Sequence, residues 1–243
     1  HSGAYLFRPQ GQGSTHKTSP QCIVVRGEHG ADVYTKISDA ATRVAHLSDH
    51  DGVGGAQLKM DYLVDLGTGK WMDKDLLVRF ESDVASSGDL FTDLNGFQMD
   101  KHTRPAAGGP KCTYFDKPGQ DCHPIQSHFF PMVSSAFVQG PSSAGGSQRL
   151  TLHSMAPCAV ASLRDGWLEA GLDRRLSRDD EKGLMEGVKD NVLTRVSFAL
   201  TAEHSAAPVP AAATPHPTLL SRRVSENNNR PVIGMFGSGG SAA

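Results

Sequence analysis

Hydrophobic and polar residues alternate in many short runs along the chain. Clear examples of this alternation are residues 22–26, 33–37, 42–47, 58–66, 76–84, 136–139, 148–153, 166–172 and 192–200. Successive side chains of a β-strand point to opposite faces of a sheet, so such alternation predicts strands with one buried face. The number and spacing of the runs predict an all-β fold, an antiparallel β-sandwich.

The segments between the runs contain residues that favour tight turns. Asp-Gly or Ser-Gly pairs occur at 51–52, 87–88 and 165–166, and the 243 residues include 26 glycines and 14 prolines. These pairs tolerate the backbone conformations of hairpin turns. The composition therefore supports an antiparallel arrangement, in one domain or two small ones.

Two segments are expected to lie outside this sandwich. Residues 100–127 are polar and rich in glycine and proline, which predicts a long surface insertion. From residue 202 to residue 243 the chain consists largely of alanine, proline, serine and asparagine, a composition that buries too little apolar surface to offset the entropy of ordering. We therefore predict a β-sandwich region over residues 1–201 and a disordered low-complexity tail over residues 202–243.

The most highly charged segment is residues 162–191, SLRDGWLEAGLDRRLSRDDEKGLMEGVKDN, in which 14 of 30 residues are charged. Four glycines interrupt it, and each would cost a helix about 1 kcal/mol relative to alanine. The segment therefore predicts strand, loop and strand. Arg174 and Arg175 are expected to form bidentate ion pairs with acidic residues of 179–181. A solvated loop with only weak surface pairs is the alternative.

The charge and hydropathy of the chain exclude some classes of partner. The formal net charge is −2, so there is no basic excess to attract the phosphates of a nucleic acid, and we expect no nucleic-acid partner. No run approaches the roughly 18 apolar residues of a transmembrane helix, so we expect no membrane span in this chain. No Asn-x-Ser/Thr glycosylation site is present.

The charged segment and four further strings resemble one family of enzymes. The strings are SGAYLF (2–7), TDLNGFQ (92–98), HFFPM (128–132) and RLTLH (149–153). Together they resemble the C-terminal half of glycoside hydrolase family 38 α-mannosidases, most closely the Golgi mannosidase II branch. The five strings occur in the family's order and span residues 2–191, with long unmatched stretches between them.

The resemblance implies a parent enzyme that hydrolyses α-mannosidic bonds of N-glycans, with zinc and a covalent mannosyl intermediate. In the family, the aspartate nucleophile and the zinc ligands belong to an N-terminal catalytic domain, whose motifs do not occur here. We therefore expect no catalytic residue, no metal ligand and negligible turnover in this chain alone, and we expect the N-terminal catalytic domain as its partner. The expected location is the lumen of the secretory pathway, the Golgi first and the vacuole or lysosome next.

Two residues are expected to bind substrate because of the resemblance. Tyr5 matches a family tyrosine that reaches the catalytic pocket, whereas a buried tyrosine at the start of a strand is the alternative. Lys182 occupies a position near the sugar where the family usually has arginine, and lysine lacks the planar fork of arginine. The residues expected to shape the loop around Lys182 are Asp173, Arg174, Arg175, Asp179, Asp180 and Asn191.

Other polar clusters are weaker candidates for chemistry. Asp179 and Asp180 are adjacent and would point to opposite faces of a strand, so they do not form a facing catalytic pair. Two mixed sets have potential metal ligands without the tight spacing of zinc sites. These sets are His46, Asp49, His50 and Asp51, and Cys112, Cys122, His123 and His128.

The two cysteines that flank residues 113–121 leave two possibilities open. A disulfide between Cys112 and Cys122 would stabilise the fold by roughly 2–3 kcal/mol and suits the oxidising lumen implied by the resemblance. Two unpaired thiols in a surface insertion are the equal alternative.

An alternative function is a non-catalytic carbohydrate-binding or protein-interaction module. Exposed tryptophans on one face would favour it, because their rings stack on sugars, and Trp71 and Trp167 are the two candidates. A core position is the other reading for each of them. Asp93 and Asn95, within TDLNG, are expected to form a turn in which their side chains cap their own backbone.

Overall fold

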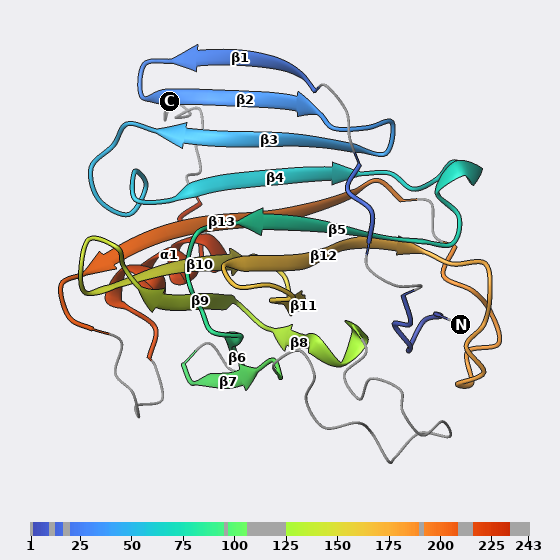
Figure 1. Cartoon of the computed structure of the whole chain (residues 1–243). Coiled ribbons are helices and arrows are strands. Elements are labelled where there is room, and N and C mark those ends of the chain that lie inside the picture. Colours follow the sequence, from blue (N-terminus) through green and yellow to red (C-terminus); the bar gives the residue numbers. More distant parts are fainter. Residues whose placement is uncertain are drawn as a thin grey trace, which may run out of the picture.

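The computed structural model of this chain describes residues 2–9, 13–16, 20–94, 97–105, 125–189, 192–208 and 216–233. These residues form two antiparallel β-sheets that pack face to face, with a single longer helix on the outside (Figure 1). The predicted all-β fold, an antiparallel sandwich, is therefore confirmed.

The larger sheet has nine strands in the order β1-β2-β3-β4-β13-β10-β9-β6-β7, and every neighbouring pair is antiparallel. β13, the last strand among the described residues, lies between β4 and β10 and so joins strands β1 to β4 to strands β10, β9, β6 and β7 in one sheet. The strand bounds are β1 (Gln21–Gly27), β2 (Gly30–Lys36), β3 (Ala41–Ser48), β4 (Leu58–Val64), β6 (Asp89–Asp93), β7 (Met99–Thr103), β9 (Ser135–Pro141), β10 (Ser147–Ser154) and β13 (Thr194–Ser205).

The smaller sheet has four antiparallel strands in the order β5-β12-β11-β8. The strand bounds are β5 (Lys74–Glu81), β8 (Phe129–Met132), β11 (Cys158–Ala161) and β12 (Trp167–Arg175). A short 3₁₀ turn, η1 (Gly69–Trp71), precedes β5.

The hydrophobic core lies between the two sheets. On β4, Met60, Tyr62 and Val64 are buried in the same cluster as Leu168 and Ala170 of β12. The two-residue spacing on each strand is the alternation predicted from the sequence. Full burial of side chains of this size contributes about 1.5–3 kcal/mol each, so this cluster is the main source of stability for the sandwich.

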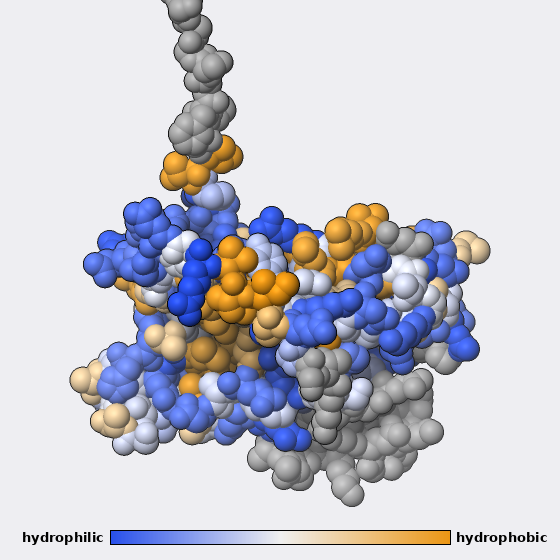
Figure 2. Space-filling model, turned by 90° about the horizontal axis from the view of Figure 1, so that it is seen from above, coloured by the Kyte–Doolittle hydropathy of each residue, from blue (hydrophilic) through white to orange (hydrophobic). Residues whose placement is uncertain are grey.

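One edge of the larger sheet extends beyond this core. All seven residues of β1 are exposed, and Ile23, Val24 and Val25 are 68%, 54% and 53% exposed. Figure 1 shows β1 and β2 above the region where the smaller sheet packs. Figure 2, which views the molecule from this side, shows apolar side chains among hydrophilic ones on the surface. The β1 edge is thus an apolar surface without a covering layer among the described residues.

The alternating runs agree with the observed strands to within a few residues for β1 to β5, β9, β10, β12 and β13. Alternation does not predict β6, β7, β8 or β11. In β6 four of five residues are buried, so both faces are apolar or enclosed and alternation is lost. β11 has only four residues, which is too short for a periodic signal.

The predicted insertion over residues 100–127 is wrong at both ends. β7 continues to Thr103 and pairs with β6, so the first residues of this segment belong to the larger sheet. The 3₁₀ turn η2 (Ile125–His128) leads directly into β8. Residues 106–124, including Cys112, Cys122 and His123, lie outside the described part of the chain.

The prediction of disorder beyond residue 201 is wrong for two segments. β13 continues to Ser205, and α1 (Leu219–Asn229) is an α-helix. The Thr218 side chain caps α1 by accepting a 3.0 Å hydrogen bond from the Ser221 N–H. α1 contacts β10 on the side of the larger sheet away from the smaller sheet (Figure 1). There, Ser225 Oγ lies 2.9 Å from His153 Nδ1.

Candidate functional site

The residues that the resemblance assigns to substrate binding lie at one end of the smaller sheet. The N-terminal segment of residues 2–9 runs beside the loop that follows β12, as Figure 1 shows at the end marked N. Within it, Gly3 N donates a 3.0 Å hydrogen bond to Leu6 O, which forms a tight turn around Tyr5. The Tyr5 side chain is 64% exposed. The alternative of a buried core tyrosine is therefore wrong.

Two residues of the charged segment hold this turn. Asp180 Oδ2 accepts hydrogen bonds from Tyr5 N at 2.7 Å and Leu6 N at 2.9 Å. Arg174 Nη2 donates to Leu6 O at 3.1 Å. We call Arg174 and Asp180 the clamp. The clamp fixes the backbone of Tyr5 and leaves its phenol free to contact another molecule.

The predicted ion pairs between the arginines and residues 179–181 are wrong. Arg174 Nε lies 2.9 Å from Asp75 Oδ1 of β5, on the neighbouring strand. Arg175 is buried and donates to the backbone carbonyls of Leu66, at 2.5 Å, and Thr68, at 3.3 Å. β12 places the two arginines over β5 and the β4–β5 connection, so Arg174 pairs with a carboxylate of the neighbouring strand and Arg175 binds backbone oxygens.

Close packing between the clamp and the turn explains one glycine. A Cβ atom at Gly3 would lie 2.4 Å from the Asp180 Cβ. Any side chain at residue 3 would displace Asp180 from the two N–H groups that it accepts. Gly3 is therefore required by the contact between SGAYLF and the charged segment.

The described part of the loop that follows β12, residues 176–189, is folded back on itself. Leu176 N donates a 2.7 Å hydrogen bond to Val188 O, which closes its base. A Cβ at Gly187 would lie 2.3 Å from Leu176 O, so this closure also requires glycine. Glu181 and Met185 adopt positive φ angles of 60° and 61°, as expected for a tightly turned loop. Of the predicted strand, loop and strand, the first strand and the loop are confirmed as β12 and the segment after it, whereas the next strand, β13, begins at Thr194, beyond the charged segment.

The other residues expected to shape the loop have separate roles. Asp173 Oδ1 accepts from Arg174 N at 2.7 Å, and Asp179 Oδ2 accepts from Glu181 N at 3.1 Å. Lys182 is exposed, directly after the clamp residue Asp180. Asn191 lies outside the described residues. These two hydrogen bonds are local, whereas the clamp connects the loop to the Tyr5 segment.

Electrostatics favour the ionised form of the clamp aspartate. Burial by itself would raise the pKa of Asp180, but the N–H groups of Tyr5 and Leu6 donate to its carboxylate and lower the pKa below its usual value. A carboxylate engaged in this way orders the backbone. It is poorly suited to proton transfer, because protonation would weaken both hydrogen bonds.

The strings that carry the family resemblance are neighbours in the structure. The Phe7 ring, in SGAYLF, lies 4.9 Å from the Phe129 ring of HFFPM in an edge-to-face contact. Asp93, in TDLNGFQ, is fully buried and accepts hydrogen bonds from the N–H groups of Ser134 at 2.9 Å and Ser135 at 3.0 Å. The predicted turn in which Asp93 caps its own backbone is therefore wrong, and Asn95 lies outside the described residues.

Neither tryptophan forms an open sugar platform. Trp71 packs against the hydrophobic core as a partly buried residue. The guanidinium carbons of Arg79 and Arg164 lie 4.2 Å and 4.6 Å from the centroid of the Trp167 ring, so cations cover this ring. The exposed pair of tryptophans that would favour a carbohydrate-binding module is thus not seen.

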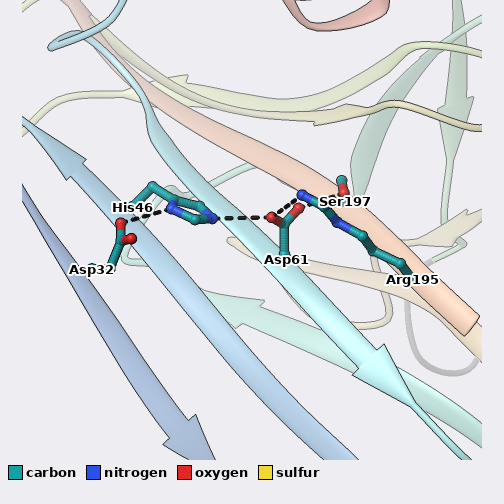
Figure 3. Close-up of polar contacts among 5 residues, drawn as sticks. All are labelled: Asp32, His46, Asp61, Arg195 and Ser197. Atoms are coloured by element: carbon teal, nitrogen blue, oxygen red, sulfur yellow. Dashed lines mark hydrogen bonds and ion pairs between the residues drawn. The ribbon is translucent and has the colours of Figure 1, made fainter. Parts of the chain in front are cut away.

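A polar network crosses four strands of the larger sheet on the face away from the core (Figure 3). His46 Nδ1 lies 2.8 Å from Asp32, and its Nε2 lies 3.0 Å from Asp61. Asp61 also accepts from Arg195 and Ser197, each at 2.5 Å. Burial would raise the pKa of Asp61, but these three hydrogen bonds together lower it.

This network resembles a catalytic triad only in composition. The Ser197 hydroxyl donates to Asp61, whereas a nucleophilic serine must donate to the histidine that removes its proton. The arrangement therefore orders four strands and does not activate a nucleophile.

The predicted set of His46, Asp49, His50 and Asp51 is divided by the structure. His46 belongs to the network on β3, whereas Asp49 and His50 follow β3 and lie beside His29 of the β1–β2 turn. Sequence spacing missed His29 because a hairpin separates it from Asp49. In the second set, only His128 falls within the described ranges.

Among the described residues, no α-helix has both the length and the hydropathy of a transmembrane span.

Comparison with known proteins points to one family. The sequence profile of "Glycosyl hydrolases family 38 C-terminal domain" matches residues 1–182. Alpha-mannosidase 2 of Arabidopsis thaliana is 36% identical over 243 residues, which cover 95% of this chain and 19% of that protein. Alpha-mannosidase 2x of Mus musculus is 34% identical over 240 residues, with 96% and 19% covered.

More distant relatives have the same kind of match. Lysosomal alpha-mannosidase of Homo sapiens is 26% identical over 196 residues, which cover 78% of this chain and 17% of that protein. The crystal structure of an alpha-mannosidase from Enterococcus faecalis aligns with a TM-score of 0.50 at 10% identity, covering 76% of this chain and 22% of that one. The structural match supports the fold alone. The chain thus corresponds to about a fifth of the length of its relatives.

Proposed function

Since the chain belongs to glycosyl hydrolase family 38 as its C-terminal domain, we propose that it is the β-sandwich portion of a zinc-dependent, retaining α-mannosidase that trims the α-mannosidic linkages of N-glycans. In this role it supplies one wall of the substrate pocket and a packing surface for the catalytic domain. The reaction centre belongs to the N-terminal catalytic domain.

The observation that carries this proposal is the arrangement of Tyr5. Its side chain is 64% exposed, while the clamp of Arg174 and Asp180 holds its backbone. A phenol on a fixed backbone presents a flat apolar ring and one hydroxyl, a combination suited to a sugar. Tyr5 therefore binds and orients the mannoside through a hydrogen bond from its hydroxyl group.

Lys182 has a secondary place in the same wall. It is exposed and follows Asp180 directly, so its position depends on the clamp. Its ammonium group is a flexible donor to sugar hydroxyls and lacks the fixed geometry of arginine. Replacing Lys182 by alanine is therefore expected to affect binding less than removal of the Tyr5 hydroxyl.

The residues around Tyr5 do not form a zinc site. The carboxylate of Asp180 is engaged by two backbone N–H groups, and tyrosine and lysine are not usual zinc ligands. We therefore assign zinc and the aspartate nucleophile to the N-terminal catalytic domain. The proposed compartment is the lumen of the secretory pathway, with the Golgi first and the vacuole or lysosome next.

The test is a matched pair of substitutions in an α-mannosidase that contains this chain. Tyr5→Phe should lower kcat/KM for a mannoside about 10- to 100-fold, because one hydrogen bond to the transition state is lost. Tyr34→Phe, a second tyrosine with an exposed side chain, should leave it unchanged. Equal values for the two variants would contradict the assignment of Tyr5.

A second experiment tests where the reaction centre lies. The 243-residue chain alone, supplied with zinc and a chromogenic α-mannoside, should show no turnover above the uncatalysed rate. Turnover that disappears with Asp179→Ala or Asp180→Ala would show that the chemistry lies within this chain.

A further inference from the structure

Two imidazoles and one carboxylate meet at a corner of the larger sheet. One ligand atom each from His29, Asp49 and His50 lies within 4.8 Å of the other two. The two imidazole rings lie 4.8 Å apart, centroid to centroid, with 33° between their planes. All three residues are exposed, so an ion can reach them from solvent.

The backbone explains why these residues are neighbours. His29 lies in the turn between β1 and β2, and Asp49 follows the last residue of β3. Antiparallel pairing places Gly30 opposite Ser48. Asp49 N also donates a 3.3 Å hydrogen bond to His29 O, which joins the two connections directly.

Two glycines make this approach possible. Gly30 has a φ of +153°, and a Cβ there would lie 2.1 Å from Leu47 O. A Cβ at Gly55 would lie 2.1 Å from His50 O. The connection between β3 and β4 therefore packs directly against the backbone of His50. The positions of the three ligands are thus set by the sheet and by two close backbone contacts.

We propose that His29, Asp49 and His50 bind a divalent first-row transition-metal ion, with Zn²⁺ as the best match. Imidazole nitrogen and carboxylate oxygen are its usual protein ligands, at about 2.0–2.2 Å from the ion. Tetrahedral geometry then requires ligand atoms about 3.3 Å apart. The three ligand atoms lie within 4.8 Å of one another, and rotation of these exposed side chains brings them to the separation that the ion requires.

The bound ion ties the β1–β2 turn to the segment that follows β3. Water completes its coordination shell, since three protein ligands leave a position open. The β1 strand of this hairpin is exposed along its whole length, so a metal clip at this corner stabilises a part of the sheet that has little support from the core. The site is separate from the Tyr5 segment and does not depend on the proposed mannosidase function.

The test is calorimetric titration of Zn²⁺ into the 243-residue chain and its variants, with folding checked by circular dichroism. The chain should bind one Zn²⁺ in the micromolar range. His29→Ala and His50→Ala should each weaken binding at least tenfold, and Asp49→Asn should weaken it as well. His204→Ala replaces an exposed histidine elsewhere and should leave the affinity unchanged.

A second measurement identifies the ligands directly. In nitrogen-15 spectra of the histidine rings, added Zn²⁺ should shift the signals of His29 and His50 and leave those of His204 in place. Binding that is unchanged in His29→Ala and His50→Ala, or absent at millimolar Zn²⁺, would overturn the proposal.

Discussion

At the scale of single residues, buried aspartates that accept backbone N–H groups hold this molecule's key segments. Asp180 accepts from Tyr5 and Leu6, and Asp93 accepts from the backbone around Ser134. Each connects segments that are far apart in the chain. The exposed phenol of Tyr5 has a defined position because of the first of these contacts.

The adjacent aspartates of the loop provide a matched test of the clamp. Asp180→Ala should speed amide hydrogen exchange at Tyr5 and Leu6 by roughly tenfold or more, because both N–H groups lose their acceptor. Asp179→Ala should leave these two amides unchanged, since Asp179 accepts only from Glu181 among the contacts described here. Nuclear magnetic resonance of the folded chain measures both. Equal exchange rates in the two variants would show that the clamp does not hold the segment.

The sequence alone identified Tyr5 and Asp180 as important but not as partners. They are 175 residues apart, and no local spacing relates them. Closeness in sequence favours a pairing of Arg174 with the acidic residues of 179–181. Strand β12 instead places Arg174 beside Asp75 of β5. Contacts between strands depend on the order of the strands in the sheet, and the hydrophobic periodicity of the sequence does not reveal that order.

At the scale of elements, a strand can be recognised from hydrophobic alternation in the sequence only when one of its faces is buried and the other is polar. β4 alternates between the core, at Met60 and Tyr62, and the outer network, at Asp61, and was predicted. β6 is buried on both faces and was missed. α1 was missed because its composition is polar, although Thr218 is a good N-cap residue.

The contact of α1 with β10 includes a buried histidine. His153 is 1% exposed, and its ring nitrogens lie 2.9 Å from Ser225 Oγ and 3.2 Å from Thr201 Oγ1. Burial lowers the pKa of His153 from 6.5 to about 4, although the charge of Asp93 opposes this. The neutral imidazole is therefore the native form at neutral pH.

This histidine predicts an acid-sensitive stability. Between pH 6.5 and about 4 the unfolded chain binds a proton at His153 that the folded chain excludes, so the free energy of unfolding falls as the pH decreases. The contribution present above pH 6.5 and lost by pH 4 is about 3 kcal/mol. Denaturant unfolding at several pH values measures it.

The matched control separates His153 from the other titrating groups. His153→Asn should flatten the pH dependence in this window, whereas His204→Asn, at an exposed position, should retain it. An identical slope in wild type and His153→Asn would contradict the assignment.

At the scale of the whole molecule, the sandwich has two exposed surfaces that can contact other molecules. One is the Tyr5 segment at the end of the smaller sheet. The other is the β1 edge, where Ile23, Val24 and Val25 are exposed together on a strand that ends the sheet of the described residues. The chain covers about a fifth of the length of the matching relatives.

The β1 edge predicts self-association of the isolated chain. Exposed apolar edge strands pair with other edges, and a charged side chain on the strand prevents such pairing. Val25→Lys should therefore reduce concentration-dependent association in analytical ultracentrifugation. Leu219→Lys, which changes a similarly exposed apolar residue on α1, should not. Association that persists unchanged in Val25→Lys would exclude β1 as its cause.

The most direct test of the account is the structure of an α-mannosidase that contains this chain, with a mannose-like inhibitor bound in its pocket. We expect the Tyr5 hydroxyl within about 2.5–3.2 Å of a sugar oxygen, with Asp180 still accepting from Tyr5 and Leu6. A ligand that Tyr5 does not contact, directly or through one water, would contradict the proposal that this domain forms a wall of the substrate pocket.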